Sequence, residues 1–384
     1  MRKDLLFAVI LGCLSIQTQP VFGCRYNVRE VGFIDVGVET YRLFVYLPQA
    51  VPPDEVARLK ETADAALVDS NVRFEVVAAD ADANHPAMEF LAIHGITNSP
   101  AAVLVSPDGQ SIPLPLPVGP LGQVVSSALD YVLHSPTRQR ILEEAAVNYA
   151  VVLLIEGPQQ DHNIQAREVV SAAIGRIREQ LDLLPKPISR TPVVIALDPP
   201  SFDRERLLLW SLGLKPQDVK EPCAAVFYGR GRWIGPLVKG AKLMADPLTA
   251  LLFVIGSDCE CGLDHRLLQG TMLPVRWDQS LQQKVAESVG FDPEDPLVKM
   301  EMVSIVRRGM GGFDGPSMPF GYREIQIGSD PEESMDEAAE AIASNPQSAI
   351  HNPHLTKVLA TSLGSMAAIV VIASILVVLR ARKK

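Results

Sequence analysis

One order of segments occurs twice along this chain, and the repetition constrains the fold more than any other feature of the sequence. In the first copy, a strand-like run at residues 41–47 precedes a helical pattern at 54–70, a second strand-like run at 73–79 and a short helical segment. Pro100 then leads into the apolar run "AAVLV", the turn "SPDG", a further strand and a helical pattern at about 121–133. This alternation of strand and helix periodicity predicts a mixed α/β unit.

The second copy follows the same order. A strand-like run at residues 151–155 precedes a long amphipathic pattern at 164–181, a second strand-like run at 192–197 and a short helical segment. Pro222 is followed by the apolar run "AAVFY", the turn "GRGR" and a last helical pattern at 246–255. Two copies of one supersecondary plan are the simplest account of this self-similarity.

The repeated plan resembles the thioredoxin fold, in which a proline with a cis peptide bond precedes the first strand of the closing hairpin. The resemblance covers residues 38–256, and it implies that Pro100 and Pro222 are the two cis prolines. Proline is the residue before which a cis bond costs least. We therefore expect an α/β protein with two tandem thioredoxin-like domains, at residues 24–145 and 146–256, and a C-terminal transmembrane helix.

The positions that carry the active site in thioredoxin-like enzymes hold no cysteine here. Such enzymes place a Cys-x-x-Cys pair between the first strand and its helix, where the helix N-terminus lowers the pKa of a thiol. The corresponding stretches read "PQAVPPDE" at 48–55 and "GPQQDHN" at 157–163. Disulfide exchange by the ordinary mechanism is therefore excluded at both places. The sequence favours a protein that is not an enzyme, and an enzyme whose chemistry leaves no motif stays an open alternative.

Both ends of the chain carry targeting patterns. Residues 1–23 combine a basic start, an apolar run and compact residues before Cys24, which is typical of a secretory signal peptide. The predicted transmembrane helix at 355–379 contains an uncharged run at 358–379, long enough at about 1.5 Å per residue to cross a hydrocarbon layer of about 30 Å. The basic tail at 380–384 indicates the cytoplasmic side. We expect a single-pass protein of the cell membrane whose bulk is extracytoplasmic and whose C-terminus is cytoplasmic.

Two further segments lie between the second repeat and the membrane. Residues 257–306 are expected to form an α/β extension, and residues 307–354, which are rich in glycine and proline and then acidic, a stalk or linker. Within the membrane segment, Ala360, Gly364 and Ala368 recur every four residues. Small residues at this spacing let two transmembrane helices approach closely, so the pattern allows a homodimer.

The overall charge restricts the class of partner. The formal net charge is −10 at pH 7 and no basic stripe is present. Proteins that bind nucleic acid neutralise phosphates with clustered lysine and arginine, so we expect no nucleic-acid partner. An apolar content of 47% over 384 residues is enough to fill the cores of two or three domains.

The cysteines allow more than one arrangement. Removal of the signal segment would take Cys13 with it and leave Cys24, Cys223, Cys259 and Cys261. An even number outside the cytoplasm favours two disulfides, with Cys259 and Cys261 joined separately to Cys24 and Cys223. A cysteine directly after a signal cleavage point also resembles a bacterial lipoprotein site, so lipidation of Cys24 is the alternative.

A metal site is a second interpretation of the same residues. In the stretch "CECGLDH", Cys259, Cys261 and His265 could act as ligands, and Cys223 could complete a tetrahedron. Thiolates with an imidazole suit zinc or copper(I). Cys223, beside Pro222, could also act alone as an accessible thiol. The sequence indicates no other cofactor.

Two hypotheses for function follow. The first is a membrane-anchored extracytoplasmic interaction or scaffold protein that contacts the lipid bilayer through its C-terminal helix. The resemblance implies that redox-inactive thioredoxin-like units of this kind bind a protein or peptide partner as an extended strand beside the proline. The alternative is a thiol- or metal-binding protein that uses Cys223, Cys259, Cys261 and His265.

Overall fold

The computed structural model describes residues 25–34, 40–48, 50–79, 84–184, 186, 188, 190–258 and 272–309. Every described residue belongs to one compact unit, which lies within Met1–Asp314. The predicted signal segment, most of the stalk, the membrane segment at 355–379 and the basic tail all lie outside the described ranges. Within those ranges, no helix combines the length and the apolar character that crossing a membrane requires.

The first sheet is formed by the first copy of the repeated order. Its strands are β1 (Tyr41–Leu47), β2 (Val72–Ala78), β3 (Ala101–Val105) and β4 (Ser111–Pro113). The strands lie in the order β2-β1-β3-β4, with β1 parallel to β2 and antiparallel to β3, and β4 antiparallel to β3. The last pair between β1 and β3 joins Tyr46 to Ala101, which places Pro100 at the end of β1 from which the chain leaves.

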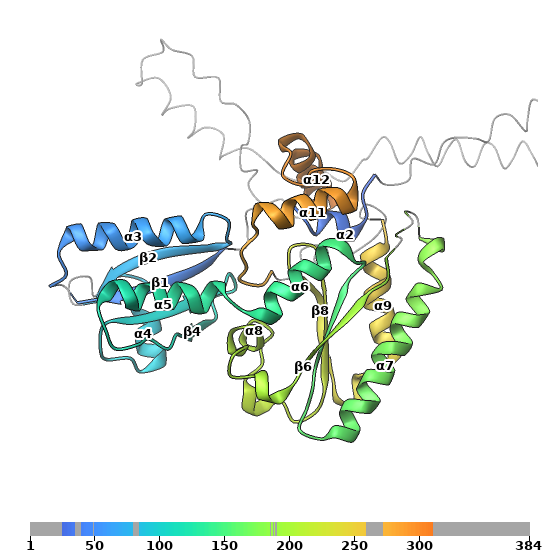
Figure 1. Cartoon of the computed structure of the whole chain (residues 1–384), viewed down its shortest axis with the longest axis horizontal. Helices are drawn as coiled ribbons and strands as arrows, with labels where there is room; N and C mark the ends of the chain where they lie inside the picture. The colour runs from blue at the N-terminus through green and yellow to red at the C-terminus, as the bar shows by residue number, and fades with distance from the viewer. Residues whose placement is uncertain are drawn as a thin grey trace, which may run out of the picture. The chain divides into compact units, whose positions relative to one another are not determined.

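Helices cover the two faces of this sheet unequally (Figure 1). One face packs against α3 (Pro53–Leu67) and α5 (Leu121–Leu133), and the other packs against the short α4 (Met88–His94). The α3 and α5 side forms the larger core, with Leu59, Ala63, Val125 and Leu129 among its members. The proline and the two acidic residues that begin α3 suit a helix N-terminus.

The second sheet repeats the same topology. Its strands are β5 (Val151–Ile155), β6 (Val193–Leu197), β7 (Cys223–Tyr228) and β8 (Arg232–Lys239). They lie in the order β6-β5-β7-β8, with β5 parallel to β6 and with β7 antiparallel to both β5 and β8. A parallel first pair and an antiparallel closing hairpin in this order define the thioredoxin-like fold, so the predicted fold is confirmed for both copies.

The second sheet is enclosed on both faces. One face packs against α7 (Gln160–Arg178) and α9 (Ala245–Gly256). The other packs against α6 (Pro136–Val147), α8 (Arg206–Ser211) and α11 (Gln279–Val289). The remaining described helices are α2 (Val28–Val31), α12 (Pro296–Gly309) and the 3-10 turns η1 (Leu181–Leu183), η2 (Pro199–Ser201), η3 (Pro216–Asp218) and η4 (Gly240–Lys242).

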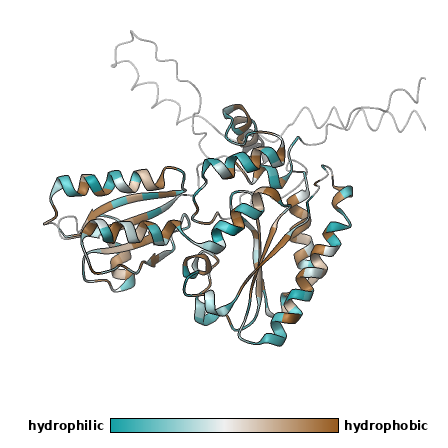
Figure 2. Cartoon of the chain, viewed as in Figure 1, coloured by the Kyte–Doolittle hydropathy of each residue, from teal (hydrophilic) through white to brown (hydrophobic). Residues whose placement is uncertain are grey.

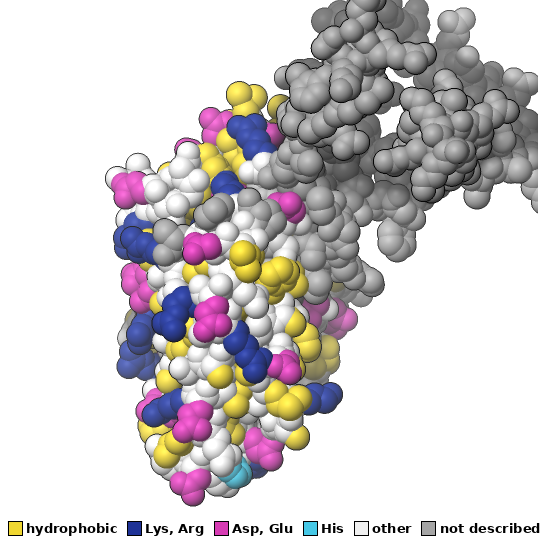
Figure 3. Space-filling model, turned by 90° about the vertical axis from the view of Figure 1, so that its right-hand side faces the viewer, with side chains coloured by type: hydrophobic (Ala, Val, Ile, Leu, Met, Phe, Trp, Pro, Cys, Tyr) yellow, Lys and Arg dark blue, Asp and Glu magenta, His cyan; other side chains and the backbone are white. Residues whose placement is uncertain are grey.

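Apolar residues are concentrated in the strands and on the inner sides of the helices, whereas the outer sides of α3 and α7 are mainly hydrophilic (Figure 2). Figure 3 looks onto the side of the molecule on which α7 lies in Figure 1, and acidic and basic side chains are interspersed over that face. Neither sign of charge dominates there.

The N-terminal residues pack against the second sheet, although the sequence prediction placed them in the first domain. Val28, Val31 and Ile34 belong to the core on the α7 and α9 side, and Phe33 belongs to the core on the opposite side. The backbone N–H of Val28 donates to the carbonyl of Ser257 at 3.1 Å, directly after α9. The physical reason is that the apolar side chains of this short segment are buried in the two cores of the second sheet.

The predicted extension at 257–306 connects the two sheets in its described part. The side chain of Asn71, before β2, donates to the carbonyl of Leu273 at 2.8 Å and accepts from the N–H of Val275 at 2.9 Å. Tyr41 Oη donates to the carbonyl of Met272 at 2.9 Å, and Met272 also forms an isolated bridge with Arg232 at the start of β8. The segment at 272–277 therefore ties the beginning of the first sheet to the second.

Candidate functional site

The Ser99–Pro100 peptide bond is cis, as the resemblance predicts for Pro100. It is the only cis bond among the described residues, so the prediction of a second cis proline at Pro222 is wrong. The backbone of Glu221 lies against Gly157, where an added Cβ would come within 3.2 Å of the Glu221 Cα. The carbonyl of Pro222 accepts from the N–H of Gly240 at 3.4 Å. These contacts carry the chain into β7 with a trans bond.

Three segments of the first unit meet at the end of the sheet where Pro100 lies. The pairing of Tyr46 with Ala101 brings the end of β1 beside Pro100, and the loop to α3 starts there. The N–H of Leu114 donates to the carbonyl of Ala102 at 2.9 Å, so the loop from β4 to α5 leaves the sheet at the same end. In thioredoxin-like enzymes, this is the end of the sheet that carries the reactive cysteines.

The surface at this end is exposed and includes an unpartnered apolar residue. Asn98, Ser99 and Pro100 are exposed, and Val118 in the loop before α5 is 104% exposed. No backbone hydrogen bond is formed by Asn98 or Ser99 with any other residue that the structure describes. Backbone N–H and carbonyl groups that are left unpaired can pair with a strand of another chain. We call Asn98, Ser99, Pro100 and Val118 the Pro100 edge.

The corresponding place in the second unit is closed. Pro222 is buried, and the Glu221 carboxylate lies over Gly240, where an added Cβ would overlap it. A cavity of about 260 Å³ remains, and its lining includes His162, Pro222 and Gly240. The loop before α7 is held by Asn163, whose side chain accepts from the N–H of Gly157 at 2.8 Å and donates to its carbonyl at 2.9 Å. This paired, buried arrangement leaves little backbone for a ligand.

Cys223 is a buried free thiol at the start of β7. Its exposed fraction is 2%, and burial raises its pKa to about 12, so it is protonated at neutral pH. A thiol needs its thiolate form to act as a nucleophile or metal ligand. The prediction of an accessible thiol at Cys223 is therefore wrong, whereas the disulfide stays a prediction because its proposed partners Cys259 and Cys261 lie outside the described residues.

The other candidate ligands cannot be placed beside Cys223. Cys24, Cys259, Cys261 and His265 lie outside the described residues. In the described part of the chain, no cluster of three or more His, Cys, Asp or Glu side chains is arranged to hold a metal ion. The zinc or copper site and the lipidation of Cys24 stay predictions.

Sequence reasoning found Pro100 but missed Ser99 and Val118 as site residues. The available signal for Val118 was its position as a single valine in the loop "PVGP", where it has no helical or strand neighbours to pack against. Ser99 contributes its backbone, and a free backbone group leaves no mark in a sequence.

No protein-family model matches the chain, and no curated protein matches it. Several solved structures are similar at low identity. The first two thioredoxin domains of Saccharomyces cerevisiae Eps1p share 9% identity with a TM-score of 0.21, over 56% of this chain and 91% of that chain. The zinc-bound form of human ERp44 shares 12% with a TM-score of 0.20, over 61% of this chain and 60% of that one.

A third similar structure is the NTD_N/C domain of the alkylhydroperoxide reductase AhpF from Enterococcus faecalis. It shares 14% identity with a TM-score of 0.17, over 56% of this chain and 91% of that chain. The assignment of a thioredoxin-like fold to this chain rests on its own strand order and strand directions.

Proposed function

We propose that this protein is a membrane-anchored, extracytoplasmic interaction protein whose first thioredoxin-like unit binds an extended peptide segment of a partner at the Pro100 edge. The observation that carries the proposal is that Asn98 and Ser99 are exposed residues whose backbone groups form no hydrogen bond with any other described backbone group. A peptide strand could pair with these groups and satisfy its own N–H and carbonyl groups at the same time.

The apolar side of the edge supports the same proposal. Val118 is 104% exposed, and the loop that carries it leaves the sheet at the end where Pro100 lies. Burying such a side chain against an apolar residue of the peptide contributes about 1.5 to 3 kcal/mol. Backbone pairing would hold the peptide, and Val118 would favour segments with an apolar residue at one position.

The chemistry of the site supports binding without disulfide exchange. The N-terminal turns of α3 and α7 carry no cysteine, and the thiol of Cys223 is buried with a raised pKa. Disulfide exchange requires attack by a thiolate. The membrane anchor at 355–379 and the extracytoplasmic location remain part of the proposal on the strength of the sequence patterns.

The test uses an immobilised array of randomised decapeptides and the full chain in detergent solution. We expect the wild-type protein to bind a subset of peptides with an apolar residue in common, and Val118→Asp to weaken that binding at least about tenfold. Val68→Asp is the matched control, because Val68 is 76% exposed directly after the last residue of α3, at the helix end opposite the one nearest the Pro100 edge. Equal losses in the two variants, or no bound peptide, would contradict the proposal.

Two further measurements separate strand pairing and catalysis. N-methylation of a central amide in a bound peptide should abolish its binding, because it removes the donor that pairs with the edge. In an insulin reduction assay with dithiothreitol, the protein should leave the rate unchanged. Binding that tolerates N-methylation at every position would rule out pairing by a strand, and an accelerated reduction would show that a thiol is active.

A further inference from the structure

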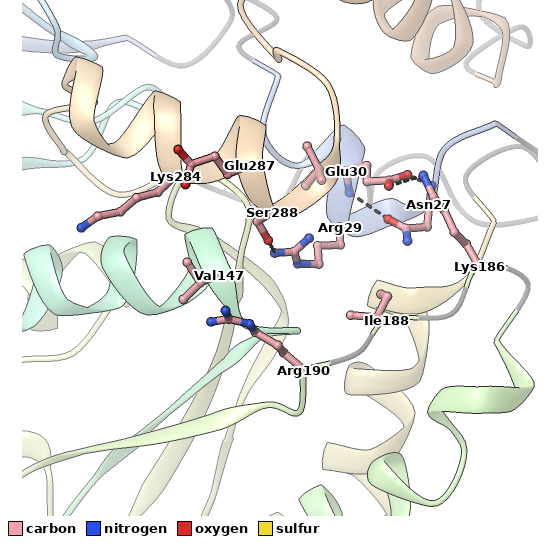
Figure 4. Close-up of a pocket in the computed structure, with 11 residues that line it drawn as sticks. Asn27, Arg29, Glu30, Val147, Lys186, Ile188, Arg190, Lys284, Glu287 and Ser288 are labelled. Carbon is pink, nitrogen blue, oxygen red and sulfur yellow. Dashed lines mark hydrogen bonds and ion pairs between the residues drawn. The ribbon is translucent and has the colours of Figure 1, made fainter.

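A cavity of about 420 Å³ lies where separate parts of the chain meet beside the second sheet (Figure 4). Its walls come from α2, from the C-terminal end of α6, from α11 and from the segment that leads into β6. The charged residues of its lining are Arg29, Glu30, Lys186, Arg190, Lys284 and Glu287. Helices α2 and α11 are additions to the repeated thioredoxin-like order, so this cavity is separate from the Pro100 edge.

Arg29 is the most constrained of these side chains. Its exposed fraction is 4%, its Nε donates to the carbonyl of Asn148 at 2.9 Å, and its Nη2 donates to the carbonyl of Ala146 and to Ser288 Oγ, both at 3.2 Å. The guanidinium carbon lies 5.1 Å from the centre of the Phe33 ring. Its orientation is thereby fixed, while Nη1 has no hydrogen-bond partner within the described part of the chain.

Two further cations line the same cavity and have no partner in the part of the chain that the structure describes. Neither Arg190 nor Lys284 forms a hydrogen bond or ion pair with another described residue. Burial lowers the pKa of Arg29 to about 10, and the neighbouring charge of Arg190 acts in the same direction, so Arg29 stays cationic at neutral pH. Figure 4 shows the guanidinium groups of Arg29 and Arg190 turned toward the same space. Like charges that share a cavity are unfavourable until an anion lies between them.

The carboxylates of the lining are already engaged. Glu30 is paired with Lys186 and accepts from the backbone N–H of Asn27 at 3.0 Å. Glu287 accepts from Gln283 Nε2 at 2.9 Å. Four cations against two carboxylates leave the lining with a charge of about +2, whereas the whole chain has a net charge of −10. The cavity is thus a local basic site in an acidic protein.

We propose that this cavity binds a small molecule that carries a doubly charged phosphoryl group. The charge of the lining matches a dianion, and the planar guanidinium fork of arginine suits phosphate oxygens. A volume of about 420 Å³ lies within the range of small-molecule sites and exceeds what one phosphate group fills. Arg29 supplies a fixed donor, and Arg190 and Lys284 supply charges that no described residue neutralises.

The test is isothermal titration calorimetry on the full chain in detergent solution, with glycerol 3-phosphate, inorganic phosphate and succinate as separate probes. We expect glycerol 3-phosphate to bind and Arg190→Ala to weaken that binding by about 10- to 100-fold, the effect of removing one charge-assisted contact. Because Arg190 is exposed and unpaired in the described structure, its loss should leave the fold intact.

Arg178→Ala is the matched control, since Arg178 is an exposed arginine at the end of α7 and does not line the cavity. It should bind like the wild type. Inorganic phosphate binding as tightly as the ester would support phosphoryl recognition and assign free phosphate as the ligand, while tighter binding of the ester would assign an ester. The proposal is overturned if no phosphate probe binds, if succinate binds as tightly, or if Arg178→Ala loses as much affinity as Arg190→Ala.

Discussion

The hairpin of the first sheet turns through Gly109 and that of the second through Gly229, and the two turns have different surroundings. A Cβ added to Gly109 would meet nothing within 4 Å, whereas one added to Gly229 would overlap the backbone of Gly32. The N–H of Arg230 also donates to the carbonyl of Gly32 at 3.1 Å. The same turn is therefore a free surface in one copy and a docking point for the N-terminal segment in the other.

This difference extends to whole faces of the sheets. On the face that α4 covers in the first unit, the second unit has α6, α8 and α11. The proline that is exposed in the first unit as Pro100 is buried in the second as Pro222. In this duplicated fold, the second unit is thus the more enclosed one, whereas the first unit keeps an exposed surface that is available for binding.

The largest effect should come from removing one phenylalanine from each unit. Phe227 is 0% exposed in β7, and Phe227→Ala should cost about 3 to 5 kcal/mol of unfolding free energy. Phe44, which lines a cavity of about 560 Å³ beside Phe90, should cost less as Phe44→Ala, near the lower end of the same range, because the site can relax and admit water. Urea denaturation with hydrogen exchange of the strand amides measures both. If the two variants lost the same unfolding free energy, the second sheet would not be more enclosed than the first.

Substitution of the two turn glycines, Gly109 and Gly229, should give a smaller difference in unfolding free energy. Gly109→Ala should cost about 1 to 2 kcal/mol, the penalty for a Cβ at a positive φ of 84°. Gly229→Ala should cost about 3 kcal/mol or more, because the overlap with Gly32 adds to the same penalty. Thermal and urea unfolding of the two variants measures the two losses of unfolding free energy. If Gly229→Ala were no worse than Gly109→Ala, the N-terminal segment would not be docked as described.

The thiol of Cys223 gives no effect at neutral pH, and its contribution to the unfolding free energy changes only at alkaline pH. Its pKa is raised from 9.0 to about 12, chiefly by burial, so the folded state keeps a proton that the unfolded state loses above pH 9. The resulting stability is present in full below pH 9 and is lost as pH rises toward 12, by up to about 1.4 kcal/mol per pH unit. Cys223→Ala should show a shallower loss over this window in urea denaturation at several pH values. An unchanged slope would mean that the thiol is accessible to solvent.

The elements of both sheets were largely predictable, because their periodicity is local. The predicted strand at 41–47 coincides with β1 (Tyr41–Leu47), and the predicted helix at 164–181 corresponds to α7 (Gln160–Arg178). That helix begins earlier than predicted because its first residues, Gln160 and Asp161, are polar and carry no apolar period.

The features that distinguish the two copies were not predictable, because they depend on contacts between distant residues. Pro100 and Pro222 occur in similar local sequences, and the contacts of Glu221 and Pro222 with Gly157 and Gly240 have no counterpart that the sequence around Pro100 would reveal. The pairing of Arg29 with the end of α6 joins residues 119 apart in the chain. A single sequence does not show which distant residues come into contact. The absence of cysteine at the starts of both helices, in contrast, is visible in the sequence itself.

The placement of residues 25–34 sets an order for the biogenesis of this protein. The side chains of Arg25 and Glu301 interact across 276 positions of sequence, and those of Arg29 and Ser288 across 259. Contacts of such long range form late, after the intervening chain has been synthesised. Residues 25–34 are thus synthesised before most of the chain but are among the last to reach their final position, and until then their apolar side chains are candidates for protection by a chaperone.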